Sequence, residues 1–106
     1  MHVKAESTYT VAIFMAGDMA QAKQVCREFC ERGFCVHIHP ADFIYTGGEE
    51  AGFKIGLVNY PRFPSTPDDL WQKADDLARM LIVRLFQHSA LLVAPDKTEW
   101  ITRREP

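Results

Sequence analysis

The side chains most able to do chemistry lie in one stretch, Phe43 to Pro64, which reads FIYTGGEEAGFKIGLVNYPRFP. Its glycines and β-prone runs predict a β-hairpin, with Glu49 and Glu50 side by side at the tip of a loop from Gly47 to Gly52. Together with Tyr45 these carboxylates could serve in acid/base chemistry. Carboxylates on a flexible loop are seldom held rigidly enough for that work, so we assign no catalytic residue. The loop is then either a solvated tip or a place that holds a cation or a basic partner.

The hairpin is followed by an arginine between aromatic residues, with Tyr60 before Arg62 and Phe63 after it. Such an arginine suits stacking and bidentate contact with a carboxylate, a phosphate or a base, and the neighbouring prolines reduce its freedom before binding. In the alternative interpretation, Tyr60 and Phe63 close the bottom of the core while Arg62 pairs with Asp68 or Asp69. Both interpretations are compatible with the sequence.

A metal site would depend on His37 and His39, which share one face of a strand because they are two residues apart. Two ligands are too few for a stable site. The third would have to be Cys35, an acidic side chain of the loop, or His2 or His88 brought in by the fold. We therefore predict no metal and no cofactor.

Composition places the chain among ordinary globular proteins. It has 106 residues, 47% of them hydrophobic and 25% charged. The net charge of −2 argues against general electrostatic binding of nucleic acid.

Cys26, Cys30 and Cys35 are an odd number of cysteines, so we expect free thiols in a reducing compartment. No leader and no apolar run long enough to span a bilayer is visible, which predicts a cytoplasmic protein. There is no nucleophile elbow, phosphate loop or metalloprotease helix.

The remaining patterns predict the elements that must hold these side chains. Two helices are expected after the caps Asp18 and Thr66, the second of them with Pro67 in its first turn. The expected elements are strand 8–15, helix 19–32, strand 34–39, hairpin strands 43–46 and 53–59, helix 67–87, strand 90–94 and strand 98–103. This order resembles the ferredoxin-like βαββαβ sandwich, an α+β fold with two helices on one face of an antiparallel sheet, extended here by a C-terminal hairpin. We expect a single domain from 1 to 106, with 1–7 as a loose lead-in.

Such a fold leaves one face of its sheet uncovered. Phe14, His37 and His39 are expected there, unless the final hairpin covers them, and an aromatic and imidazole surface suits a dimer or partner interface. The sequence also resembles small uncharacterised proteins of bacteriophages and prophages, which implies a host protein as partner. The main prediction is therefore a non-enzymatic, homodimeric protein that binds another macromolecule through this face or through 43–64. The alternatives are a regulatory domain that binds a small ligand or nucleotide with Arg62, Tyr60 and the glycine loop, and a small enzyme.

Overall fold

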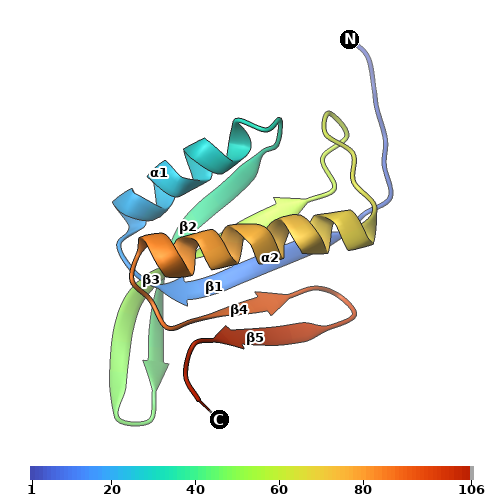
Figure 1. Cartoon of the computed structure of the whole chain (residues 1–106). Coiled ribbons are helices and arrows are strands. Elements are labelled where there is room, and N and C mark those ends of the chain that lie inside the picture. The colour runs from blue at the N-terminus through green and yellow to red at the C-terminus, as the bar shows by residue number, and fades with distance from the viewer. Residues whose placement is uncertain (106) are drawn as a thin grey trace.

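A five-stranded antiparallel sheet carries two helices on one face (Figure 1). The structure is a computed structural model, and it describes residues 1–105. The elements are β1 (Thr10–Ala16), α1 (Met19–Cys30), β2 (Val36–Tyr45), β3 (Gly48–Val58), α2 (Pro67–Arg84), β4 (Ser89–Val93) and β5 (Thr98–Thr102). The strands lie in the order β2-β3-β1-β4-β5. The first four give the ferredoxin-like arrangement, and β5 extends it at the edge beside β4, so the predicted fold class is confirmed. The β4–β5 hairpin widens the sheet and does not cover its open face.

Both helices begin where their capping residues predict. The Asp18 carboxylate accepts a hydrogen bond from the Gln21 amide at 2.9 Å, and the Thr66 hydroxyl accepts one from the Asp69 amide at 3.1 Å. Each bond satisfies one of the amides that a helix leaves free at its first turn. Neither helix within residues 1–105 is long and apolar enough to cross a bilayer.

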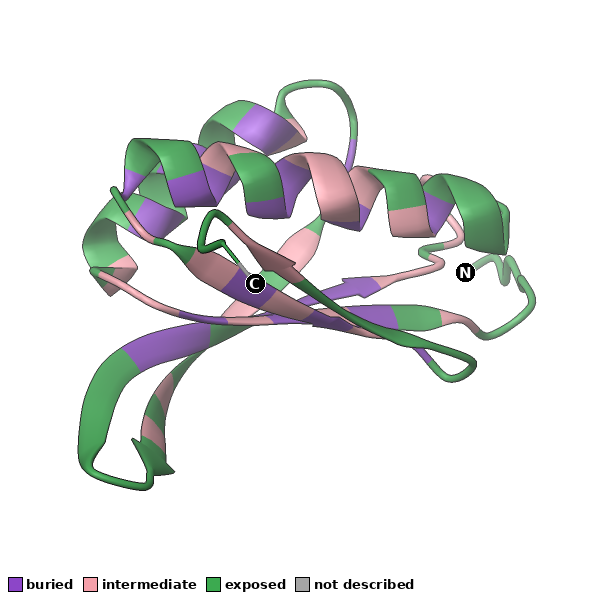
Figure 2. Ribbon diagram, turned by 60° about the horizontal axis from the view of Figure 1, so that its bottom comes forward, coloured by how far each residue is buried: buried purple, intermediate pink, exposed green. Residues whose placement is uncertain are grey.

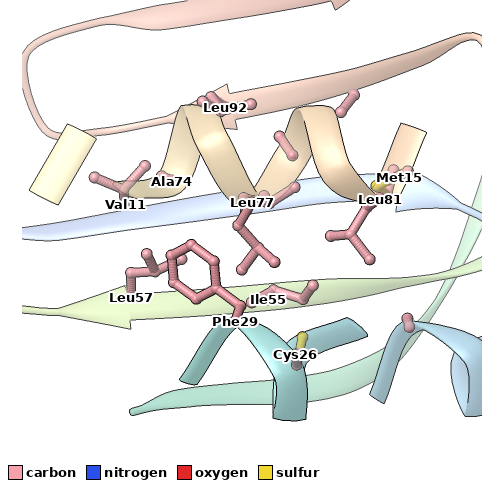
Figure 3. Packing of buried hydrophobic residues seen from close by; sticks show 14 of the residues in the cluster. Val11, Met15, Cys26, Phe29, Ile55, Leu57, Ala74, Leu77, Leu81 and Leu92 are labelled. Atoms are coloured by element: carbon pink, nitrogen blue, oxygen red, sulfur yellow. The ribbon is translucent and has the colours of Figure 1, made fainter. Parts of the chain in front are cut away.

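The core lies between the sheet and the helices (Figure 3). Alternate residues of β1 and β3 point toward the helices and are fully or almost fully buried, which is the pattern of strands covered on one face. The largest buried side chains are Phe29, Phe53, Ile13, Ile55, Leu57, Leu70, Leu77, Leu81 and Leu92. Cys26 joins this core as a free thiol, and burial raises its pKa to about 11, so it stays protonated at neutral pH. The other two cysteines are also free, as predicted.

The predicted loop between the two hairpin strands is wrong. Tyr45 pairs directly with Gly48, so only Thr46 and Gly47 form the turn, and Gly47 takes a φ of +87° that glycine adopts at little cost. Glu49 and Glu50 therefore belong to β3 and not to a loop tip. As strand neighbours they point to opposite faces, so the two carboxylates do not act together.

β2 also runs without interruption through Pro40, so the segments 34–39 and 43–46, which were expected as separate strands, contribute to a single strand. Pro40 pairs with Phe53 in a continuous register from Val36 to Tyr45. β2 is an edge strand, so a residue without an amide proton removes no bond that the sheet requires on its outer side.

α2 ends at Arg84, three residues before the predicted end. The Gln87 amide bonds to the Ile82 carbonyl at 3.0 Å, and Phe86 turns the chain with a φ of +55°. These are the marks of a Schellman motif, in which glycine usually takes the place that Phe86 has here. Phe86 is 87% exposed, whereas Leu81 and Ile82 in the last turn of the helix are buried.

Candidate functional site

A cleft of about 820 Å³ opens on the uncovered face of the sheet, a volume within the range of small-molecule sites. It lies between the β2–β3 hairpin on one side and the β4–β5 hairpin on the other. It is lined by Phe14, Met15, Ala16, Asp42, Phe43, Ile44, Tyr45, Glu50, Gln87, His88, Ser89, Ala90, Leu91, Trp100 and Arg104. Segments from four separate parts of the chain therefore meet in it.

One wall is the far end of the β2–β3 hairpin. β3 pairs with β1 as far as Gly52, and the Ala51 carbonyl still accepts a hydrogen bond from the Gly17 amide at 3.3 Å. The end of the hairpin beyond Ala51 pairs with β2 and projects past the sheet (Figure 2). Phe43, Tyr45 and Glu50 lie on the open face of this projection, because they alternate with residues that face the helix side. The pairing of Phe43 with Glu50 fixes the position of the carboxylate on this wall.

The opposite side is a row of large apolar side chains. Phe14 pairs with Leu91, and Leu91 pairs with Trp100, so the three residues lie side by side across β1, β4 and β5. Directly paired side chains are about 5 Å apart, which makes the row a continuous apolar surface. Trp100 is 59% exposed at the end of this row and offers an open ring face to a ligand.

Small residues create the hollow between the two sides. Gly52 pairs with Ala16, and the ring of Phe43 lies over Gly52. A methyl group at Gly52 would come within 2.7 Å of the Ala16 Cα and 2.8 Å of the Phe43 ring, and it would also collide with the Met15 carbonyl. Glycine is therefore required here by close packing of the backbone, and it seats the aromatic wall of the cleft.

Charge in the cleft is arranged around the Tyr45 hydroxyl. Partial removal from water raises the pKa of this phenol, the nearby Glu50 carboxylate raises it further, and Arg104 opposes the shift. Tyr45 is consequently a neutral hydrogen-bond donor at neutral pH and not a base. Among residues 1–105, neither Glu50 nor Arg104 has an ion-pair partner within 4.0 Å.

The rim of the cleft follows the Schellman motif at the end of α2. The left-handed turn at Phe86 brings Gln87 and His88 to the cleft. The His88 carbonyl accepts a hydrogen bond from the Arg103 amide at 2.8 Å, which ties this rim to the segment that carries Arg104. An unfavourable φ for a non-glycine residue next to a cleft is a common feature of functional sites.

His37 and His39 lie on the open face as expected, but outside the cleft. Their ring nitrogens Nδ1 and Nε2 are 2.8 Å apart, and burial, followed by His39 and Lys54, lowers the pKa of His37. Within residues 1–105 no third histidine, cysteine or acidic residue joins them in a group that could hold a metal ion. Cys35 is exposed near the start of the strand.

Tyr60 and Arg62 lie at the other end of β3, far from Glu50, and do not line the cleft. The Arg62 guanidinium stacks over Phe63 at 5.3 Å, and Phe63 packs against the core. No ion pair joins Arg62 to Asp68 or Asp69 in the described part of the chain. The interpretation with Phe63 closing the core is correct for that residue, whereas Tyr60 is exposed and Arg62 interacts with the aromatic ring.

The structure divides the predicted site residues. Phe14, Tyr45 and Glu50 meet in the cleft, and Glu49 points to the opposite face of the hairpin. Trp100 and Arg104 were not predicted for the site. The alternation of the last strand and the position of that strand in a ferredoxin-like sheet carry the only signal that could have placed Trp100 beside Phe14.

Comparison with known proteins gives a structural likeness only. No protein-family model matches the chain, and no curated protein matches its sequence. A phage S-adenosylmethionine (SAM) lyase in complex with S-methyl-5'-thioadenosine is similar with a TM-score of 0.63 and 12% identity, over 99% of this chain and 98% of that one. A phage SAM lyase in the apo state is similar with a TM-score of 0.66 and 13% identity, over 92% and 91% of the two chains. At these identities the likeness establishes a shared fold.

These structures overturn the main functional prediction. Both neighbours are phage proteins, which agrees with the phage resemblance, but both are lyases of a small molecule, and one holds a nucleoside thioether. The expected non-enzymatic binding of a macromolecule is therefore contradicted, and the small-ligand alternative is favoured. The residues that the alternative named, Arg62 and Tyr60, lie outside the cleft. The chain thus shares the fold of phage SAM lyases and carries a ligand-sized cleft on the open face of its sheet.

Proposed function

We propose that this chain binds SAM, or a nucleoside closely related to it, in the cleft between the β2–β3 and β4–β5 hairpins. The observation that carries the proposal is the combination, in one cleft, of an open tryptophan face with a carboxylate beside a tyrosine hydroxyl. The whole-length likeness to a fold that holds S-methyl-5'-thioadenosine in a phage lyase supports the same ligand class.

The apolar row suits the purine. An adenine ring stacks on aromatic side chains with a gain of about 1–3 kcal/mol per base, and Trp100 offers the largest exposed ring in the cleft. Phe14 and Leu91 continue that surface beneath the ligand. A flat ring laid across them removes apolar area from water on both sides.

The polar wall suits the remainder of the molecule. The Glu50 carboxylate can accept hydrogen bonds from ribose hydroxyls or face the positive sulfonium, and the Tyr45 hydroxyl can donate to a ligand oxygen. A sulfonium is also attracted to the face of an aromatic ring. The cleft therefore has the two kinds of surface that SAM requires, one apolar and flat and the other anionic.

Isothermal titration calorimetry with S-methyl-5'-thioadenosine tests the binding proposal without turnover. We expect saturable binding by the wild-type protein, and at least about tenfold weaker binding of cytidine, whose smaller ring stacks over less surface. Absence of any heat with the thioadenosine, in a protein whose thermal unfolding shows that it is folded, would reject the proposal.

Cleavage of SAM is the second candidate function, favoured by the position of Glu50 in the cleft and by the lyase activity named for both neighbours. In one elimination route, the bond that breaks joins the sulfur to the amino acid portion of SAM, and a base takes a proton from the carbon adjacent to the carbon of that bond. The C–H electron pair becomes a C=C bond in the amino acid product, and the C–S pair leaves with the sulfur as neutral S-methyl-5'-thioadenosine. Glu50 is the carboxylate placed to accept that proton, since Tyr45 is held protonated.

Chromatographic detection of S-methyl-5'-thioadenosine after incubation with SAM tests this second function. We expect release by the wild-type protein and at least a hundredfold slower release by Glu50→Gln, within the range that a general base contributes. Glu49→Gln is the matched control, because its side chain points away from the cleft and its rate should match the wild type. Equal rates in both variants would exclude Glu50 as the base.

A further inference from the structure

Two opposite charges face the same cleft without neutralising each other. Glu50 and Arg104 both line the cleft, and both act on the Tyr45 hydroxyl, the first raising and the second lowering the pKa of this phenol. Within residues 1–105 neither of them forms an ion pair within 4.0 Å. A positive and a negative group that flank one hydroxyl, yet remain apart, leave room for a ligand that carries both charges.

Each charge has a fixed backbone position. Glu50 is held by its strand pairing with Phe43 on the projecting wall. On the opposite wall the Arg104 amide donates to the Thr102 hydroxyl at 3.0 Å, and the preceding Arg103 amide donates to the His88 carbonyl at 2.8 Å. The chain just beyond β5 therefore stays beside His88 at the rim, and Arg104 lines the cleft.

The chemistry of the two groups differs in a way that defines the ligand. A guanidinium presents paired donors that match a carboxylate, and a carboxylate attracts a sulfonium or an ammonium. We infer that Arg104 and Glu50 recognise the zwitterionic amino acid end of the ligand. On this view Arg104 binds its carboxylate and Glu50 its cationic groups, while the aromatic row holds the nucleoside. This inference rests on the proposed SAM-class function and adds the feature that selects the substrate.

Recognition of the amino acid end affects turnover, because substrate and product differ in that part of the molecule. S-Methyl-5'-thioadenosine keeps the nucleoside and the sulfur but lacks the amine, the carboxylate and the positive charge. It therefore lacks the groups that Arg104 and Glu50 recognise at the amino acid end, and it should bind more weakly than a ligand with the complete amino acid end. A cleft of this kind holds the intact substrate and releases the truncated nucleoside.

Three ligands that undergo no sulfonium cleavage separate these contributions in calorimetric titrations. S-Adenosylhomocysteine carries the amino acid end on a neutral sulfur, sinefungin adds a protonated amine near the sulfur position, and S-methyl-5'-thioadenosine lacks both features. We expect the wild-type protein to bind the first two at least about tenfold more tightly than the third, the factor that one charge-assisted contact provides.

Variants assign each charge to its partner. Arg104→Gln should lose about tenfold in affinity for S-adenosylhomocysteine and sinefungin while its affinity for S-methyl-5'-thioadenosine stays within twofold of the wild type. Glu50→Gln should weaken sinefungin more than S-adenosylhomocysteine. Arg103→Gln is the matched control with the same change in net charge outside the cleft, and it should leave all three affinities unchanged.

Recognition of the amino acid end and binding of the nucleoside can fail separately in these titrations. Equal loss for all three ligands in Arg104→Gln, or the same loss in Arg103→Gln, would overturn the inference while nucleoside binding stands. Wild-type affinities that do not depend on the amino acid end would do the same. If none of the three ligands binds to the wild-type protein, the proposed function fails and the inference fails with it.

Discussion

Similar side chains lie near the two ends of β3, but at one end they line an open cleft and at the other they contact one another. At one end the cleft contains Tyr45, Trp100 and Arg104, and at the other the segment 60–63 contains Tyr60, Arg62 and Phe63. In that segment the aromatic residues and the arginine contact one another. Tyr60 bridges to Phe63, and Arg62 stacks on the same ring. In the cleft the tyrosine comes from β2, whereas the tryptophan and the arginine come from β5 and the segment that follows it, and an open space lies between them.

The difference lies in sequence separation and not in residue type. Aromatic residues and an arginine that are close in sequence satisfy one another locally. The Asn59 side chain reinforces this closure, since it accepts from the Ser65 amide and donates to the Ser7 carbonyl, both at 2.8 Å. The same residue types brought together from the two flanks of a sheet leave a space between them that a ligand can fill.

The largest expected effect is a loss of stability when the glycine beside the cleft is replaced, compared with a glycine near the other end of β3. Gly52→Ala should lower the free energy of unfolding by about 3 kcal/mol, because its methyl group meets backbone atoms of β1. Gly33→Ala, beside Phe63, has no atom closer than 3.9 Å and should lose only about 1 kcal/mol from its positive φ. Urea unfolding of both variants measures the difference. Equal losses would show that the cleft is not built on this close packing.

Removing one aromatic ring from each end should change ligand affinity at only one of them. Trp100→Ala is expected to weaken S-methyl-5'-thioadenosine by about 30-fold, since stacking on a base contributes about 2 kcal/mol. Tyr60→Ala removes another exposed aromatic side chain, which lies outside the cleft, and should leave the affinity within twofold. Calorimetric titration of both variants measures this, and a larger loss in Tyr60→Ala would transfer the site to the other end of β3.

Replacing Phe86, which has an unfavourable positive φ at the rim of the cleft, with glycine should stabilise the protein. Phe86→Gly keeps the Schellman hydrogen bonds, removes the cost of a positive φ and exposes no core, so the free energy of unfolding should rise by about 1 kcal/mol. The melting temperature should rise by about 5 °C. A decrease would mean that the Phe86 ring has a stabilising contact that its exposure conceals.

The smallest expected effect concerns Tyr9, whose carbonyl accepts a hydrogen bond from the Asn59 amide just before the segment 60–63. The Tyr9 hydroxyl donates to the Asp96 carboxylate at 2.7 Å, and this bond is the main reason that its pKa rises from 10.0 to about 12. The neutral phenol is thus favoured in the folded state. Its contribution to stability is complete below pH 10 and is lost as the pH rises from 10 toward 12.

Urea unfolding at pH 9 and pH 11 compares the wild type with Tyr9→Phe. The wild type should lose more stability between the two pH values, because the variant has no phenol at this position to ionise. Parallel losses in the two proteins would show that the bond to Asp96 does not persist in solution.

The sequence predicted those parts of the molecule that depend on local patterns. Asp18 and Thr66 marked both helix starts, and the alternation of Val11, Ile13 and Met15 marked the buried face of β1. Element order then led to the correct fold class. The helix end at Phe86 was missed because an aromatic residue occupies the place where glycine normally signals a Schellman motif.

The cleft could be predicted only in fragments. Tyr45, Glu50 and Phe14 were named as candidates, but Glu50 was predicted to lie in a loop, whereas it belongs to β3. Trp100 and Arg104 lie about 50 residues further along the chain, and only the position of β5 at the sheet edge brings them near. The expected homodimer stays a prediction, which light scattering after size-exclusion chromatography tests.

Nuclear magnetic resonance mapping with S-methyl-5'-thioadenosine tests the central claim most directly, because it locates the ligand on the protein. We expect the largest shift changes at the Trp100 indole and at the amides of 43–50 and 87–91, with residues 59–63 unchanged. Changes confined to 59–63, or no changes at saturating ligand, would contradict the assignment of the cleft as a nucleoside site.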